Sequence, residues 1–210
     1  MSILDQLSCA KGERGETGNV RLAEKLASSK DKKSIAEVAA GLDVARRDIR
    51  NDCIKVLYEL GAADPALIRP FAATFARLLA HKDNRMVWGA MTALDAIAAA
   101  YPGDIVEHLP AVNAAAKTGS VITRDHAIGI LVKLAALPAH RKRCLNQLAA
   151  HLEAAPPNQV GMYAEIVAPL LKEPAGKNLA AILERRIDDL PKESQQRRVC
   201  KVLNRAKPAN

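Results

Sequence analysis

After residue 20, apolar side chains recur at the three- and four-residue spacing of helices, and glycine or proline interrupts them at short intervals. The pattern predicts helices over the following residues: 20–29, 32–42, 44–61, 65–81, 84–101, 104–117, 121–137, 139–154, 158–172, 175–190 and 192–206. No segment alternates apolar and polar residues between turns as a half-buried strand does. We therefore predict an all-α fold.

A second pattern repeats about every 37 residues. Small residues recur 37 residues apart and then once more after 36, at Cys53, Ala90, Ala127, Ala164 and Cys200. Larger apolar residues follow most of them four and seven positions later, on the same helical face, at Leu57, Leu60, Leu94, Ile97, Leu131, Leu134 and Leu171. A period of 20–50 residues indicates stacked repeats, each burying its apolar face against the next. We predict an α-solenoid (a superhelix) of about five antiparallel helix pairs.

The repeat resembles those of the HEAT-repeat family. Its best unit contains Leu67-Ile68-Arg69-Pro70-Phe71, then Leu78-Leu79-Ala80-His81-Lys82-Asp83, and then Met86-Val87 before Ala90 and Leu94. This is similar to the family's proline in the first helix, its Leu-Leu-x-Asp turn and its Val-Arg-x-x-Ala-x-x-x-Leu second helix. The Val-Arg element recurs as Ile49-Arg50, Thr123-Arg124 and Gln196-Arg197, but not in the other two repeats. The resemblance covers roughly residues 30–207. It implies a scaffold or adaptor that binds proteins, since nucleic-acid binders and enzymes are rarer in this family.

The composition agrees with helices and excludes several other classes of protein. Of the 210 residues, 49% are apolar and only 3% are aromatic, whereas β-rich domains use more aromatic and β-branched residues. The length suits one repeat domain, which we place over 20–210. Residues 8–19 contain three glycines and no large apolar side chain, so we expect a flexible N-terminal segment over 1–19. No apolar stretch approaches the ~18 residues of a membrane span, and we expect neither a signal peptide nor membrane association.

Positive charge gathers at the C-terminal end. The net charge is +8, and residues 172–210 supply +5 of it, with ten basic and five acidic side chains. The last predicted helix, which we expect to cap the repeat domain, carries a basic patch: Lys192, Arg197, Arg198, Lys201, Arg205 and Lys207. Such a patch either faces solvent or meets phosphate or an acidic protein.

Residues that could catalyse a reaction or bind a metal or nucleotide do not occur at the spacings of the known motifs for these functions. The four cysteines, Cys9, Cys53, Cys144 and Cys200, form no CxxC pair, and the five histidines form no HxxxH or HExxH motif. The sequence also lacks a P-loop, a GxSxG motif and a strand-associated GxGxxG. We therefore expect no catalytic residues, no metal, no cofactor and no enzyme activity. Unpaired cysteines favour free thiols in a reducing cytoplasm.

One position of the second helix differs between repeats and is a candidate for binding. It lies two residues before the small residue and is occupied by Asn51, Trp88, Asp125, Met162 and Arg198. Because it is mostly polar, we expect it to face solvent or a groove, where Trp88 either anchors a partner or packs between repeats. Arg50, Arg124 and Arg197 either hydrogen-bond carboxylates of a neighbouring repeat or bind an anion. The predicted partner-binding residues are Arg50, Asn51, Trp88, Arg124, Asp125 and Arg198.

These observations favour a non-enzymatic module that binds a protein or peptide on a curved helical surface. The alternative is nucleic-acid binding through the basic patch and the groove arginines, with an affinity that falls steeply with salt. A third and remote interpretation is a HEAT-like DNA glycosylase, which needs aromatic side chains and a carboxylate around a base. One Trp and three Tyr offer little for that task.

Overall fold

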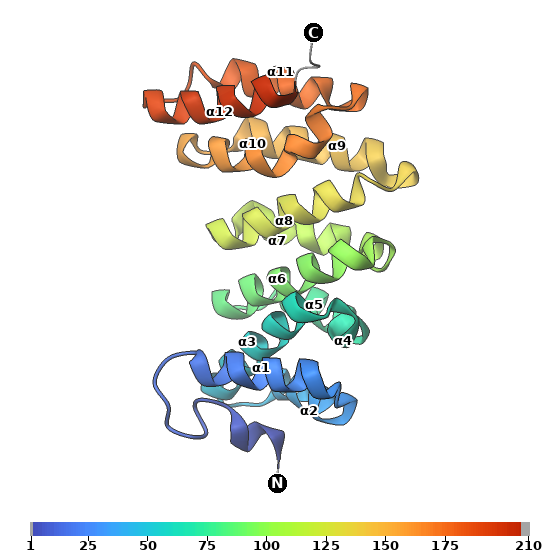
Figure 1. The fold of residues 1–210 in the computed structure, drawn as a ribbon, viewed down its shortest axis with the longest axis vertical. Helices are drawn as coiled ribbons and strands as arrows, with labels where there is room; N and C mark the ends of the chain where they lie inside the picture. Colours follow the sequence, from blue (N-terminus) through green and yellow to red (C-terminus); the bar gives the residue numbers. More distant parts are fainter. Residues whose placement is uncertain (1, 207–210) are drawn as a thin grey trace. The chain divides into compact units, whose positions relative to one another are not determined.

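The computed structural model describes residues 2–206, and this part of the chain is helical with no strand (Figure 1). It consists of two compact units, which divide after Ala127. Each unit is described by itself, and the single repeat domain expected over 20–210 stays a prediction. No helix in the described residues is long and apolar enough to cross a membrane.

Unit 1, which ends at Ala127, stacks alternate helices. Its α-helices are α1 Thr17–Ser29, α2 Lys32–Ala40, α3 Arg47–Ala63, α4 Pro65–Ile68, α5 Ala72–Leu78, α6 Asn84–Ala100 and α7 Leu109–Thr118. Short 3-10 helices occupy Ile3–Gln6, Gly41–Asp43, Arg69–Phe71 and Pro102–His108. Helix α3 packs against α1 on one side and α6 on the other, while α2, α4 and α5 pack beside them. Helix α8, Val121–Leu134, begins in this unit and ends in the next.

Unit 2 repeats this arrangement with four further helices. They are α9 Pro138–Ala154, α10 Pro157–Leu171, α11 Lys177–Arg186 and α12 Glu193–Ala206, with a 3-10 turn over Pro174–Gly176. Helix α10 packs against α12, and α9 packs against α11, so again every second helix is a neighbour in space (Figure 1). The predicted all-α fold is confirmed.

The core of each unit is built on the predicted 37-residue register. Cys53, Ala90, Ala127 and Ala164 lie in α3, α6, α8 and α10, and all four are completely buried. A small residue at this position lets the neighbouring helix come close. The helices also approach closely next to it, at Gly89 of α6, where an added Cβ would lie 2.6 Å from Cγ1 of Ile54 on α3.

Prolines account for the main departures from the predicted helix boundaries. The helix expected over 65–81 is divided into α4, a 3-10 turn at Arg69–Phe71 and α5. Pro70 causes this break because it has no N–H to donate and its ring clashes with the preceding turn. The helix expected over 104–117 likewise begins as a 3-10 helix, Pro102–His108, before α7.

The N-terminal segment packs against unit 1 up to Cys9, and the residues that follow are exposed. Leu7 is completely buried, and the backbone N–H of Cys9 donates to Oδ2 of Asp52 on α3 at 2.7 Å. Residues 10–15 are exposed. The expected flexibility of residues 1–19 stays a prediction.

Candidate functional site

Two aromatic rings meet on the solvent side of α3 and α6 in unit 1. Tyr58 of α3 and Trp88 of α6 are half-buried, with ring centroids 5.6 Å apart and planes tilted by 50°. A tilted pair at this distance is an attractive arrangement of ring quadrupoles. Trp88 thus packs between two repeats, which is one of the two alternatives that the sequence left open, and part of its ring stays exposed. Whether it also anchors a partner stays a prediction.

Two cations flank the rings. Nζ of Lys55 lies 4.8 Å from the Tyr58 ring centroid, and the Arg85 guanidinium carbon lies 5.3 Å from that of Trp88. Both distances are within the range of cation–π attraction. Lys55, Tyr58, Arg85 and Trp88 are referred to below as the aromatic–cation cluster. The α3–α6 packing holds all four side chains in place before any ligand arrives.

A carboxylate from the N-terminal segment is seated on the cluster. Oε2 of Glu16 lies 3.1 Å from Nζ of Lys55, and Oε1 forms an ion pair with the Arg85 guanidinium. Lys55 also binds Oε1 of Glu59, one helical turn further along α3, at 2.6 Å. The Lys55 side chain is only 11% exposed, so this cation is held largely away from water.

The pKa shifts of Lys55 and Glu16 both favour the charged forms of these side chains. Burial works against the charged form of Lys55, but its interactions with Glu59, Tyr58 and Glu16 outweigh burial and raise its pKa. Burial likewise opposes ionisation of Glu16, yet Arg85 and Lys55 together hold the pKa of this carboxyl below its ordinary value. The cluster is therefore a pair of fixed cations beside two rings, and it can hold an anion with an apolar neighbour.

The equivalent positions in the neighbouring repeats are polar and half-buried. Asn51 and Asp125 each have one buried side-chain oxygen, Oδ1, without a hydrogen-bond partner in the described residues. Burial raises the pKa of the Asp125 carboxyl, since the charged form loses hydration there. Beside Asp125, Nδ1 of His126 lies 2.9 Å from Oδ2 of Asp95 on α6. Whether Asn51 and Asp125 contact a partner stays a prediction.

The predicted arginines at the start of the second helices bind the chain's own backbone. Arg50 donates to the carbonyl oxygens of Val44 and Ala45 at 2.8 and 2.7 Å, and Arg124 donates to that of Gly119 at 3.1 and 3.2 Å. Neither forms an ion pair with a carboxylate in the described residues. The carboxylate ladder implied by the HEAT resemblance is therefore absent at these two positions, because each guanidinium is engaged by the loop before its own helix.

Most arginines of the predicted basic patch are neutralised locally. Arg198 forms a two-pronged ion pair with Glu165 of α10, at 2.8 and 2.6 Å, and Arg197 pairs with Glu193 one turn earlier in α12 at 3.0 Å. Lys192, Lys201 and Arg205 are exposed, and Lys207 lies outside the described residues.

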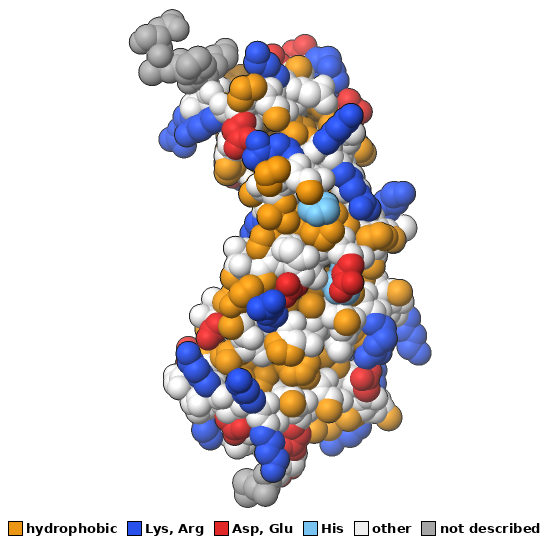
Figure 2. Space-filling model, turned by 90° about the vertical axis from the view of Figure 1, so that its right-hand side faces the viewer, with side chains coloured by type: hydrophobic (Ala, Val, Ile, Leu, Met, Phe, Trp, Pro, Cys, Tyr) orange, Lys and Arg blue, Asp and Glu red, His pale blue; other side chains and the backbone are white. Residues whose placement is uncertain are grey.

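Charges of both signs are mixed on the surface. On the face drawn in Figure 2, Lys and Arg side chains are interspersed with Asp, Glu and apolar ones rather than forming a continuous basic stripe. A stripe of that kind is the usual electrostatic footprint of nucleic-acid binding.

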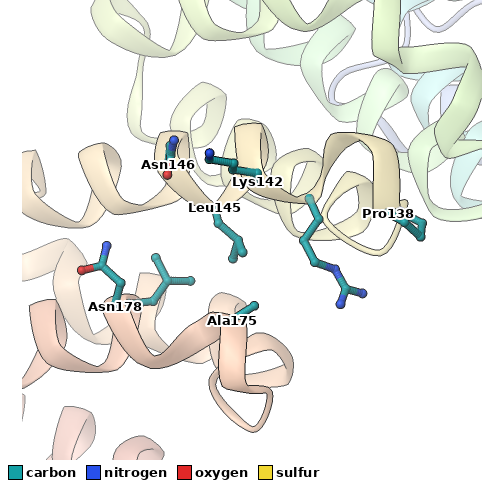
Figure 3. Close-up of a pocket in the computed structure, with 8 residues that line it drawn as sticks. Pro138, Lys142, Leu145, Asn146, Ala175 and Asn178 are labelled. Atoms are coloured by element: carbon teal, nitrogen blue, oxygen red, sulfur yellow. The ribbon is translucent and has the colours of Figure 1, made fainter.

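Unit 2 has a separate open cavity of about 390 Å³ between α9 and α11 (Figure 3). Pro138, Lys142, Leu145 and Asn146 line it from α9, and Asn178 lines it from α11. The adjacent Arg141 also lines it, but this guanidinium already binds the Ala135 carbonyl oxygen at 3.0 Å and Glu173 at 3.1 Å. The Arg141 guanidinium is thus already paired within the chain, and we assign no ligand to this cavity.

Sequence reasoning singled out Trp88 but missed the residues around it. Tyr58 lies five residues after the small register residue Cys53, and it meets the position two residues before the next one, Ala90. A comparison of the residues at those two offsets along the repeats could have predicted the contact between Tyr58 and Trp88. Glu16 left no signal, because its place depends on the path of the preceding loop.

Comparison with known proteins supports the fold and leaves the family open. Neither a protein-family model nor a curated protein matches the sequence. A designed armadillo repeat protein in complex with the peptide (KR)4 is similar in structure, with a TM-score of 0.69 and 12% identity over 97% of both chains. Armadillo repeat proteins designed for modular peptide recognition give a TM-score of 0.65 and 14% identity over 98% of both chains. A structure concerned with the interaction between cadherin and beta-catenin gives 0.58 and 14%, over 97% of this chain and 44% of the other.

At these identities the likeness shows the fold alone. The chain has the all-helical repeat architecture of the α-solenoid class, as its 37-residue period predicts. The predicted class of helical repeat is right, whereas the narrower HEAT assignment is not established by these matches.

Proposed function

We propose that this chain is a non-enzymatic binding module that holds an extended peptide segment of a partner protein against α3 and α6. The observation that carries the proposal is the aromatic–cation cluster. Partly exposed rings fixed beside cations are typical of binding hot spots, where Trp, Tyr and Arg are enriched. The cluster combines two cations with apolar rings and lies beside the carboxylates of Glu16 and Glu59. These surroundings fit a peptide with apolar and acidic side chains better than they fit a polyphosphate backbone.

The fold supports the same proposal. Of the similar designed armadillo repeat proteins, one is in complex with a peptide and another was designed for modular peptide recognition. The HEAT-like elements of the sequence, with Pro70 in the first helix and Asp83 before the second, also support our proposal that the chain is a scaffold built of two-helix repeats.

The thiols support a binding rather than a catalytic role. Burial and the neighbouring Asp52 carboxylate raise the pKa of the Cys9 thiol to about 11, and burial raises that of Cys53 to about 12. Both are therefore protonated at neutral pH, and a protonated thiol is a poor nucleophile. The four cysteines are free, which also fits the prediction of a reducing cytoplasm.

The test is selection from a random twelve-residue peptide library on the immobilised full chain, followed by fluorescence anisotropy with labelled selected peptides. Truncating a hot-spot residue costs at least ~2 kcal/mol, so Trp88→Ala is expected to weaken binding by about 30-fold or more. Trp88→Phe keeps a ring and is expected to lose much less.

The matched control is Tyr101→Ala, which removes a half-buried ring from unit 1 at the other end of α6. Tyr101 faces Arg69 there, 4.4 Å from the guanidinium carbon to the ring centroid. Circular dichroism confirms that each variant is folded. Failure to select any peptide, or equal weakening by Trp88→Ala and Tyr101→Ala, would overturn the proposal.

A further inference from the structure

Glu16 occupies the start of α1, where a side chain ordinarily caps the helix. The residue before the first turn usually accepts a hydrogen bond from a backbone N–H two or three residues later. Glu16 makes no such bond. Its carboxylate turns instead to Lys55 and Arg85, on two other helices. The contact is therefore a property of the site on α3 and α6 and is not explained by the needs of α1.

The site that receives this carboxylate is built in advance. Lys55 takes one oxygen and Arg85 takes the other, and their side chains are only 11% and 26% exposed. Glu59 fixes Lys55 from one side, and the Tyr58 and Trp88 rings lie against the two cations. Fixed donors lose little conformational freedom when they bind a carboxylate.

The charges leave room for one external anion. Two cations, Lys55 and Arg85, face two carboxylates, Glu16 and Glu59. Glu59 lies on α3 and remains in place, whereas Glu16 follows the exposed residues 10–15 and its own side chain is 42% exposed. If the partly exposed Glu16 side chain turns into water, the two cations face only one carboxylate and can accept another anion.

We propose that Lys55 and Arg85 form a carboxylate subsite, that Glu16 fills it in the free protein, and that a carboxylate of the bound peptide replaces Glu16. This inference rests on the proposed peptide-binding function and names the ligand chemistry of that site. An acidic side chain within the peptide and a free peptide C-terminus present the same group. The apolar residues next to this carboxylate contact Tyr58 and Trp88.

The probes are three sets of synthetic twelve-residue peptides with otherwise randomised sequence. The first set has Asp or Glu at a fixed central position and an amidated C-terminus, and the second has Asn or Gln at that position. The third has Ala at that position and a free C-terminal carboxylate. Full-length protein is tested as wild type, Glu16→Gln and Glu13→Gln. Glu13 is exposed, lies in the same segment and forms no ion pair in the described residues, so it controls for the charge change.

Affinity is measured by the fluorescence of Trp88, the single tryptophan of the sequence, which lies in the site itself. Acidic peptides are expected to bind about tenfold more tightly than their amide counterparts, as charge-assisted hydrogen bonds require. Glu16→Gln is expected to tighten their binding about two- to fivefold, the range of an exposed ion pair, and Glu13→Gln to leave it unchanged. Preference for the first or the third set distinguishes a side-chain carboxylate from a C-terminal one.

The outcomes separate the two proposals. Peptides that bind through Trp88 without preference for a carboxylate, and with no response to Glu16→Gln, would overturn the subsite and leave the binding function standing. Absence of binding to both wild type and Glu16→Gln would overturn both. Arg85→Gln provides a second variant, which is expected to abolish the carboxylate preference while apolar binding persists.

Discussion

The contact between Tyr58 and Trp88 can be measured by a double-mutant cycle. Trp88 is half-buried, so Trp88→Ala uncovers about 100 Å² of apolar surface, or ~2.5 kcal/mol at about 25 cal/mol per Å². Loss of the ring pair adds ~0.5–1.5 kcal/mol. The expected total is a loss of about 3–4 kcal/mol in the free energy of unfolding. Combining it with Tyr58→Ala is expected to give a coupling energy of ~1 kcal/mol, because either single substitution already removes the pair.

The assay is urea denaturation followed by circular dichroism at 222 nm, since Trp88→Ala removes the only fluorescent indole. Where the two units unfold separately, the cycle is evaluated on the transition that Trp88→Ala shifts. The control cycle pairs Trp88→Ala with Tyr101→Ala, which should be additive within ~0.5 kcal/mol. A coupling energy for Tyr58 no larger than that for Tyr101 would refute the contact on which the proposed site depends.

Three further predictions concern charged groups. Because the Glu16 pKa is lowered in the folded state, its ion pair stabilises the protein above the ordinary pKa of 4.5, and this stabilisation is lost as the pH falls through the lowered pKa. The difference in stability between wild type and Glu16→Gln, measured by urea denaturation, should therefore be present at pH 7 and gone in strong acid, and a difference that persists there would contradict the ion pair. Arg186 donates to three carbonyl oxygens at the end of α9, at 2.6, 2.7 and 2.7 Å, so Arg186→Met should lower the free energy of unfolding in chemical denaturation by about 3 kcal/mol. Arg186→Lys should recover less than half of this loss, and full recovery would exclude a role for the guanidinium fork. The basic patch has at most four cations without an ion pair, counting Lys207 by sequence alone, so the logarithm of the duplex DNA affinity in anisotropy titrations should fall with the logarithm of the salt concentration with a slope no steeper than about −3.6. A slope beyond about −5 would restore nucleic acid as the ligand.

The helices and their register were predictable because both depend on local spacing. A small residue every 37 positions, followed by large ones on the same face, requires stacked second helices whatever the rest of the chain does. Cys53, Ala90 and Ala127 are accordingly buried in α3, α6 and α8. The largest departures from the predicted helices occur where a proline favours a 3-10 turn, as at Pro70, because apolar periodicity does not record which backbone N–H groups are missing.

The site was predictable only in part. The variable position before each small residue pointed to Trp88, but the contacts that give it chemistry come from elsewhere. Tyr58 and Arg85 lie at other offsets of the second helices, and Glu16 arrives from a loop. For a related reason, the carboxylate partners expected for the arginines are not found at Arg50 and Arg124, whereas binding of a ligand by these residues stays a prediction. A guanidinium at the first turn of a helix reaches the carbonyl oxygens of the preceding loop as easily as a distant carboxylate, and Arg50 and Arg124 do so.

Two positions of each repeat lie at the seam between successive second helices, one five residues after a small register residue and the other two residues before the next one. The packing that fixes the register does not fix the side chains at these seam positions, so they determine what a partner would contact. At the seam between α3 and α6 these positions hold Tyr58 and Trp88. At the next seam they hold Asp95 of α6 and Asp125 of α8, and the adjacent His126 meets Asp95 at 2.9 Å. Packed helices lie about 10 Å apart, and an extended peptide advances about 3.3 Å per residue. A peptide lying across unit 1 therefore advances about three residues from one seam to the next. A ligand that places its carboxylate on Lys55 and Arg85 would bring a residue three positions away to the Asp95–His126 pair, where a hydrogen-bonding side chain is favoured over an apolar one.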